Sequence, residues 1–165
     1  MHHAVLSRAA NMDVIVMAAA VSDYTVTDPS RQKLAKRDEP LILTLSRTKD
    51  ILGDLGQLPS RRETNRPVLV GFAAQTHDVL AHARQKLDRK AVDLVVANDV
   101  SQPGVGFDVS TNAVTLVSRD GLEEVPLLPK TVVASRILDR VEALLSKGST
   151  PVGAKTPASY GEPSA

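Results

Sequence analysis

Three short, almost uninterrupted apolar runs constrain the fold of this chain more than any other feature. They occupy residues 13–21, 68–74 and 92–97, and Val, Ile, Leu and Ala dominate them. Runs of this kind predict strands that are covered on both faces, which is typical of parallel sheets. We therefore expect an α/β fold with a Rossmann-like, open and mostly parallel sheet that carries helices on both faces.

Helical periodicity places two longer helices around this sheet. The segment between the second and third runs predicts a helix that begins after Thr76, a suitable N-cap. A strand, a helix and a strand in this order imply a right-handed crossover. A second apolar stripe predicts a last helix that packs on the sheet. The stripes consist of Val79, Leu80, Ala83 and Leu87 in the first of these helices, and of Val133, Ile137, Val141 and Leu144 in the last.

The remaining segments are shorter or less regular. Residues 113–117 and 124–128 predict two antiparallel strands at the edge of the sheet, joined by a turn that contains Gly121. Residues 22–39 are polar and predict a long loop, with a strand at 41–45 after it. Loops of this length are often functional. The sequence also predicts short helices at 4–10 and 50–58 and a polar connection at 61–66.

Composition limits the classes of function. The 165 residues favour one domain, which we place at residues 1–147, with a disordered tail at 148–165. A net charge of +1 and an aromatic content of 2% argue against a nucleic-acid surface. No apolar run approaches the roughly 20 residues that cross a bilayer, so no membrane partner is expected. The chain has no Cys and no recognisable secretory signal, which favours a cytoplasmic protein without a thiol nucleophile.

Ligands in open α/β sheets bind beyond the carboxyl ends of the strands, so the loops at these ends are the first candidates. Asp23 follows three alanines, and its carboxylate either binds a ligand or divalent cation or caps a turn. In the long loop, Lys33 and Lys36 either close over a phosphate chain or stay solvated. Phe72 either lies against a planar base or belongs to the core.

Lys86 and Lys90 occupy an unusual position on their predicted helix. At about 100° per residue, Lys90 lies about 20° and Lys86 about 60° from Ala83, which belongs to the apolar stripe. Both lysines therefore lie along the seam between helix and sheet. Either their long stems carry the ammonium groups out to water, or both groups face an anion beyond the sheet edge.

Five blocks of the sequence together resemble the bacterial phosphopantothenate–cysteine ligase family, whose members are usually the C-terminal domain of a bifunctional protein. Their order and spacing match those of the family, and the resemblance extends over residues 1–145. The blocks are AAAVSDY at 18–24, KLAK at 33–36, VGFAAQT at 70–76, ARQK at 83–86 with Lys90, and ANDVS at 97–101.

The resemblance implies a two-step reaction on 4′-phosphopantothenate, CTP and cysteine. The carboxylate of phosphopantothenate attacks the α-phosphate of CTP to give an acyl-cytidylate and pyrophosphate, and the cysteine amine then displaces CMP. Mg²⁺ is implied as the cofactor, and CTP as the co-substrate. FMN is not expected in this chain, since the resemblance does not extend to the flavin-dependent decarboxylase domain. A homodimer with its site near the interface is also implied.

The resemblance assigns roles to individual positions but leaves the metal ligands unknown. Lys33 is the implied catalytic residue, which stabilises charge during activation, and Lys86 and Lys90 are implied to hold phosphates. The implied nucleotide-binding positions are Met17, Ala18, Ala19, Asp23, Lys33, Lys49, Asp50, Ile51, Leu52, Phe72, Lys86 and Lys90.

The chain also departs from the family's pattern. Thr48 and Lys49 stand where the family usually has Asn-Pro, and Ala35 replaces a Lys. The family's first strand, its Gly-rich turn and its Asn-containing loop do not precede Met1. The alternative is therefore a truncated, catalytically incomplete nucleotide-binding module that needs another chain. An unrelated dinucleotide binder is disfavoured, because no G-x-G-x-x-G follows any predicted strand.

Overall fold

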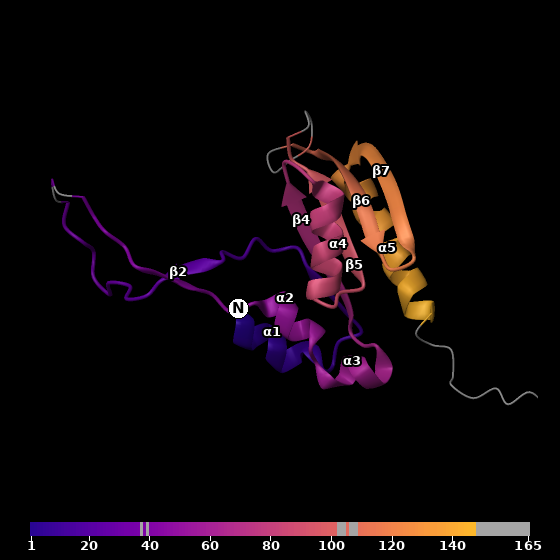
Figure 1. The fold of residues 1–165 in the computed structure, drawn as a ribbon, viewed down its shortest axis with the longest axis horizontal. Coiled ribbons are helices and arrows are strands. Elements are labelled where there is room, and N and C mark those ends of the chain that lie inside the picture. The colour runs from indigo at the N-terminus through magenta and orange to yellow at the C-terminus, as the bar shows by residue number, and fades with distance from the viewer. Residues whose placement is uncertain (37, 39, 102–104, 106–108, 148–165) are drawn as a thin grey trace, which may run out of the picture.

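The central element of the computed structural model is a five-stranded sheet with the order β1-β4-β5-β6-β7 (Figure 1). The structure describes residues 1–36, 38, 40–101, 105 and 109–147. β1, β4 and β5 are parallel, whereas β6 and β7 are antiparallel and form the predicted edge hairpin. The strands are β1 (Val14–Met17), β4 (Val68–Gln75), β5 (Leu94–Asp99), β6 (Thr111–Ser118) and β7 (Gly121–Pro129).

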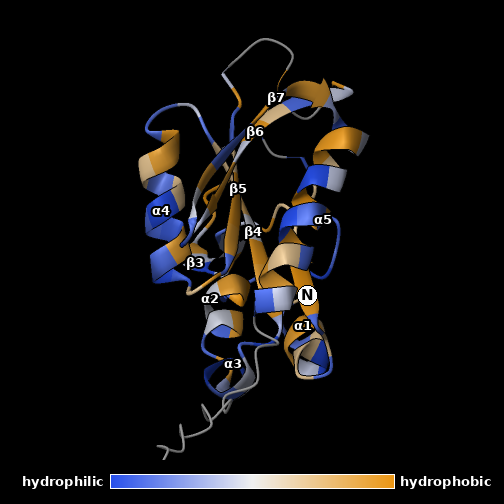
Figure 2. Ribbon diagram, turned by 90° about the vertical axis from the view of Figure 1, so that its right-hand side faces the viewer, coloured by the Kyte–Doolittle hydropathy of each residue, from blue (hydrophilic) through white to orange (hydrophobic). Residues whose placement is uncertain are grey.

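Helices cover both faces of the sheet, which confirms the expected fold class. α4 (Val79–Arg89) lies on one face and α5 (Lys130–Lys147) on the other (Figure 2). Side chains alternate between these faces along each strand, so Leu69 and Val95 join the core beneath α4, whereas Val70 and Val96 join the core beneath α5. α1 (His2–Ala9) and α2 (Ile51–Gly56) contribute to the core on the α4 side.

The long segment after β1 differs most from its prediction. β1 ends at Met17, not at residue 21, and the expected strand at 41–45 is wrong. Instead, β2 (Tyr24–Val26) pairs with β3 (Leu45–Arg47) in a separate two-stranded ribbon, and the described residues between them form a long arm that extends from the core (Figure 1). The apolar pattern at 41–45 has no core to pack on, since Ile42 is 89% exposed.

Two smaller expectations are also wrong. The segment at 61–66 is mostly helical, because α3 (Pro59–Thr64) starts at a Pro in its first turn, a favoured position for Pro. Asp78 rather than Thr76 is the N-cap of α4, and its backbone is left-handed. The predicted tail at 148–165 lies outside the described residues. No helix in the described ranges is long and apolar enough to cross a membrane.

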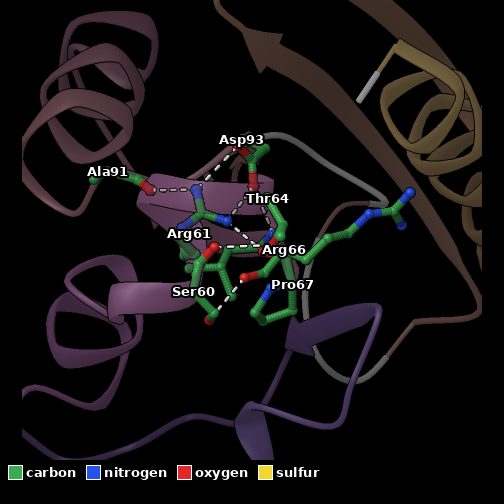
Figure 3. A network of polar contacts seen from close by, with 8 residues as sticks. Ser60, Arg61, Thr64, Arg66, Pro67, Ala91 and Asp93 are labelled. Carbon is green, nitrogen blue, oxygen red and sulfur yellow. Dashed lines mark hydrogen bonds and ion pairs between the residues drawn. The ribbon is translucent and has the colours of Figure 1, made fainter. Parts of the chain in front are cut away.

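A largely buried ion pair fixes the amino ends of β4 and β5 (Figure 3). Arg61 of α3 donates to both carboxylate oxygens of Asp93, at 2.8 and 3.1 Å, and also to the carbonyls of Pro67 and Ala91. The same carboxylate accepts the backbone N–H of Leu69 at 2.7 Å. These contacts join α3, β4 and the turn before β5 at the amino ends of the strands. A ligand is expected at the opposite, carboxyl ends.

Candidate functional site

A cavity of about 810 Å³ lies at the carboxyl ends of the parallel strands. Its walls are the end of β1 and the segment after it, the start of α2, the last residues of β4, the end of β5 and one side of α4, together with one residue each from β6 and α5. This is the place where open α/β sheets bind ligands. The lining residues are Met17, Ala18, Ala19, Ala20, Val21, Asp23, Asp50, Leu52, Phe72, Ala73, Ala74, Gln75, His82, Gln85, Lys86, Arg89, Lys90, Asn98, Asn112 and Lys130.

The cavity lies over the carboxyl ends of the strands and extends to both faces of the sheet. Ala73 packs into the core beneath α4, whereas its neighbour Phe72 packs against the core beneath α5. Asn98 continues the alternation of Val96, so it too belongs to the α5 side. Asn112 lies directly opposite Leu128, which packs against the α5-side core. We call the two parts of the cavity the α4 half and the α5 half.

Cationic side chains from α4 line the α4 half. Lys86, Arg89 and Lys90 all contribute, and Lys86 Nζ donates to the carbonyl of Phe72 at 2.5 Å. This bond lies one residue beyond the last register pair of β1 with β4, Met17 and Gly71. Burial lowers the pKa of Lys86, and repulsion from Lys90 lowers it further, against the opposing attraction of Asp23 and Asp50. An anionic ligand would relieve this repulsion.

Asp50 connects the N-terminus of α2 to the end of α4. One of its carboxylate oxygens accepts the backbone N–H of Gly53 at 3.0 Å, and the other accepts Lys90 Nζ. Partial burial raises the pKa of Asp50, but the bonds from Lys90 and Gly53 and the charges of Lys90 and Arg89 outweigh it, so the pKa lies below its usual value. Asp50 is therefore ionised, and its carboxylate holds the Lys90 side chain in place.

Gly56 permits the close approach of α2 to α4. A Cβ added at this position would lie 1.9 Å from the backbone carbonyl oxygen of Lys90. Only a residue without a side chain fits there. The contact sets the position of Lys90, the C-cap of α4, against α2.

The segment after β1 forms the remaining wall of the α4 half. Ala18, Ala19 and Ala20 are small and leave the backbone open to the cavity. The ribbon holds the next residues, since Thr48 donates its backbone N–H to the Asp23 carbonyl at 2.9 Å and its hydroxyl to the Ser22 carbonyl at 2.7 Å. The Asp23 side chain lines both this cavity and an adjacent hollow of about 380 Å³.

The structure gathers most of the site residues expected from the sequence. Lys49 and Ile51 line the adjacent hollow, which shares Asp50 and Lys90 with the main cavity. Lys33 lies on the arm and lines neither space. The expected residues that line the main cavity are Met17, Ala18, Ala19, Asp23, Asp50, Leu52, Phe72, Lys86 and Lys90.

Seven polar lining residues were not among the expected site positions, namely Gln75, His82, Gln85, Arg89, Asn98, Asn112 and Lys130. His82 and Gln85 lie on the cavity side of α4, next to the turn of Lys86, and helical spacing could have indicated them. Asn112 and Lys130 come from β6 and the start of α5, and only the pairing of β6 beside β5 brings them to this edge. The sequence predicts the hairpin but does not indicate which strand of the sheet it pairs with.

The chain is similar to known proteins over most of its length. The family model described as DNA/pantothenate metabolism flavoprotein C-terminal domain matches residues 1–145. The chain is similar to the coenzyme A biosynthesis bifunctional proteins CoaBC of Bacillus subtilis (41% identity over 145 residues, 87% of this chain) and Vibrio vulnificus (39% over 147 residues, 88% of this chain). It covers only 34% and 36% of these relatives, about a third of their length.

A solved structure shows the same fold. The crystal structure of the C-terminal domain of coenzyme A biosynthesis bifunctional protein CoaBC superposes with a TM-score of 0.66 at 33% identity. The match covers 88% of this chain and 61% of that chain.

Proposed function

Because the chain belongs to the family of DNA/pantothenate metabolism flavoprotein C-terminal domains, we propose that it catalyses the CTP-dependent ligation of 4′-phosphopantothenate to cysteine. The observation that carries the proposal is the cationic wall of the cavity, where Lys86, Arg89 and Lys90 face the ligand edge of a parallel sheet. A cluster of this kind suits a chain of phosphates. The relatives named for coenzyme A biosynthesis support the substrate class.

The proposed reaction has two balanced steps. In the first, a carboxylate oxygen of phosphopantothenate attacks the α-phosphorus of CTP, the bond to the β-phosphate oxygen breaks, and pyrophosphate leaves. In the second, the cysteine nitrogen attacks the acyl carbon, the bond to the CMP oxygen breaks, and one amine proton passes to solvent. The chain has no Cys, so the reactive groups come from the substrates.

The cavity offers groups for each part of the nucleotide. Lys86 and Lys90 would bind phosphates and withdraw charge from the leaving pyrophosphate. Phe72 would lie against the base. The backbone of Met17, Ala18 and Ala19 would approach the nucleotide closely, because the two alanines are small and the Met17 side chain packs against the core. Ile51 and Leu52, at the start of α2, would border the same ligand beside Lys49.

The acidic side chains fit the way in which Mg²⁺ binds beside nucleotides. Among the described residues no three His, Cys, Asp or Glu side chains gather into a metal cluster. Mg²⁺ commonly takes only one or two protein carboxylates together with substrate phosphates and water. Asp23 would be the first of these ligands and Asp50 the second, and the ion would neutralise phosphate charge.

The position of Lys33 on the arm bears on the oligomeric state. Lys33 lies outside the cavity on an arm with exposed Leu41, Ile42 and Leu43, which suits pairing with a second copy. Lys33 would then reach the nucleotide by closure of the arm or through that pairing. We therefore propose a homodimer, and we place the reaction in the cytoplasm, where free CTP and cysteine are expected.

Calorimetry and a product assay test the proposal together. CTP with Mg²⁺ should bind, and ATP should bind at least about tenfold more weakly, a difference of roughly 1.4 kcal/mol. Phosphopantothenate and CTP should then release pyrophosphate, and added cysteine should yield the amide, detected by mass spectrometry. Equal affinities for CTP and ATP would contradict the base assignment, and absence of pyrophosphate would contradict the ligase assignment.

The open edge of β1 favours a second candidate, a nucleotide-binding module that needs another chain. β1 pairs only with β4 within the described residues, and its Val16 is 43% exposed although its sequence resembles a covered strand. In that case the isolated chain binds CTP without pyrophosphate release. Release restored by a second polypeptide that pairs with β1 would establish this candidate.

A further inference from the structure

The nucleotide assignment leaves the polar residues of the α5 half without a role. Asn98, Asn112 and Lys130 line this part of the cavity beyond Phe72. They come from β5, β6 and the first residue of α5, and Lys130 is anchored by its backbone N–H, which donates to the Ser110 carbonyl at 2.9 Å. Three rigid elements thus converge on one small volume beside the ends of the strands.

The side chain of Asn112 points to a ligand that can donate hydrogen bonds. Its Oδ1 is shielded from water and has no hydrogen-bond partner in the described part of the chain. A buried acceptor without a partner destabilises the protein, and such groups are uncommon in native structures. An N–H group in the cavity would satisfy this oxygen after a small rotation of the amide.

The two halves of the cavity differ in the number of cationic side chains that line them. The α4 half carries Lys86, Arg89 and Lys90, which suit the several negative charges of a triphosphate. In the α5 half, Lys130 is the cation among the described lining residues, accompanied by the neutral amides of Asn98 and Asn112. One cation and neutral acceptors match one carboxylate and one amine better than a dianionic phosphate, which has little donor capacity to offer.

We propose that the α5 half binds the amino acid co-substrate, with Lys130 on its α-carboxylate and the Asn112 side chain on its amine. The inference rests on the proposed ligase function. The cavity is continuous over the ends of β4 and β5, so an amine held on the α5 side faces an acyl group whose phosphate lies on the α4 side. Asn112 orients the amine lone pair toward the acyl carbon, and Lys130 selects substrates that carry a carboxylate.

Cysteamine is the probe that separates these roles, because it is cysteine without the carboxylate. The wild-type chain should use cysteine with a kcat/KM at least about tenfold above that for cysteamine, as expected for one charge-assisted contact. Lys130→Met should lose that preference, so that its kcat/KM values for cysteine and cysteamine become equal within about twofold. Lys130→Arg should keep most of the preference.

Asn112→Leu should raise the KM for both amines by about tenfold, more than it changes the KM for phosphopantothenate. Lys147→Met removes an exposed cation outside the cavity and is the matched control. Thermal unfolding establishes that every variant is folded, and Asn112→Ser provides a second variant in case the Leu substitution disturbs β6.

The outcomes distinguish this inference from the proposed function. A wild-type chain that releases no pyrophosphate overturns both. Pyrophosphate release together with an unchanged cysteine preference in Lys130→Met overturns the amino acid site alone. A rise in the KM for phosphopantothenate in Lys130→Met, with the cysteine preference intact, would instead assign this half to the phosphate of that substrate.

Discussion

Replacement of Lys86 by Met should separate ligand binding from stability. Met keeps most of the aliphatic stem and removes the charge, which burial and Lys90 both disfavour in the free protein. The loss of the bond to the Phe72 carbonyl costs about 1 kcal/mol, and relief of the buried charge offsets much of it. We expect the free energy of unfolding to change by less than about 1 kcal/mol.

Nucleotide affinity should respond much more strongly. A charge-assisted hydrogen bond to a phosphate contributes about 2 kcal/mol, so the Kd for CTP should rise about 30-fold in Lys86→Met. Because the pKa of Lys86 lies below its usual value, a bound phosphate raises it again, and CTP binding at alkaline pH should take up protons. The variant should lose that uptake.

Calorimetry in buffers of different ionisation enthalpy measures affinity and proton uptake together. Urea unfolding of the same preparations measures stability, and Lys147→Met serves as the control for removal of a cation. An unchanged Kd would refute the assignment of Lys86 to phosphate. A loss of stability above about 2 kcal/mol would show instead that the lysine serves mainly to hold β4.

Further predictions concern the supports of the site. Gly56→Ala should destabilise the fold by about 1–3 kcal/mol and weaken CTP binding, as seen by urea unfolding and calorimetry, because the new Cβ meets the Lys90 carbonyl. Asp93→Asn should cost about 3 kcal/mol in urea unfolding, since it leaves the largely buried guanidinium of Arg61 without its counter-charge. The pKa of Asp50 is lower in the folded protein than its ordinary value of 3.8, so the ionised Asp50 stabilises the fold at pH values above 3.8. This stabilisation is lost as the pH falls through the folded pKa. Asp50→Asn should therefore make the free energy of unfolding depend less on pH in the acid range. Lys33→Ala should slow pyrophosphate release in single-turnover assays more than it raises the Kd for CTP, and equal losses would contradict a role in the transition state.

The sequence predicted the sheet and the α4 half of the cavity because both depend on local periodicity. Apolar runs indicate the parallel strands, and the angular spacing of Lys86 and Lys90 from Ala83 indicates the seam that they occupy. The packing of that helix then follows from its apolar stripe. Local pattern and tertiary structure agree in this part of the chain.

The remaining features depend on contacts between distant segments. Residues 41–45 alternate like a strand, but they can form one only where a partner surface exists. Within the described residues β3 pairs only with β2. Asn112 and Lys130 reach the cavity through the antiparallel pairing of β6 beside β5. The sequence predicts the β6–β7 hairpin at the edge of the sheet but does not indicate that it joins β5, which is why these positions were not expected.

The division of the cavity into an α4 half and an α5 half, on opposite faces of the sheet, has a consequence for inhibitor design. A compound that occupies both halves must curve over the ends of β4 and β5, so its central linker should be short and bent, whereas a straight, rigid scaffold would fill one side only. Since Phe72 and Ala73 are consecutive residues that face opposite sides, contacts on each side can be optimised by separate chemical series and then joined across this ridge.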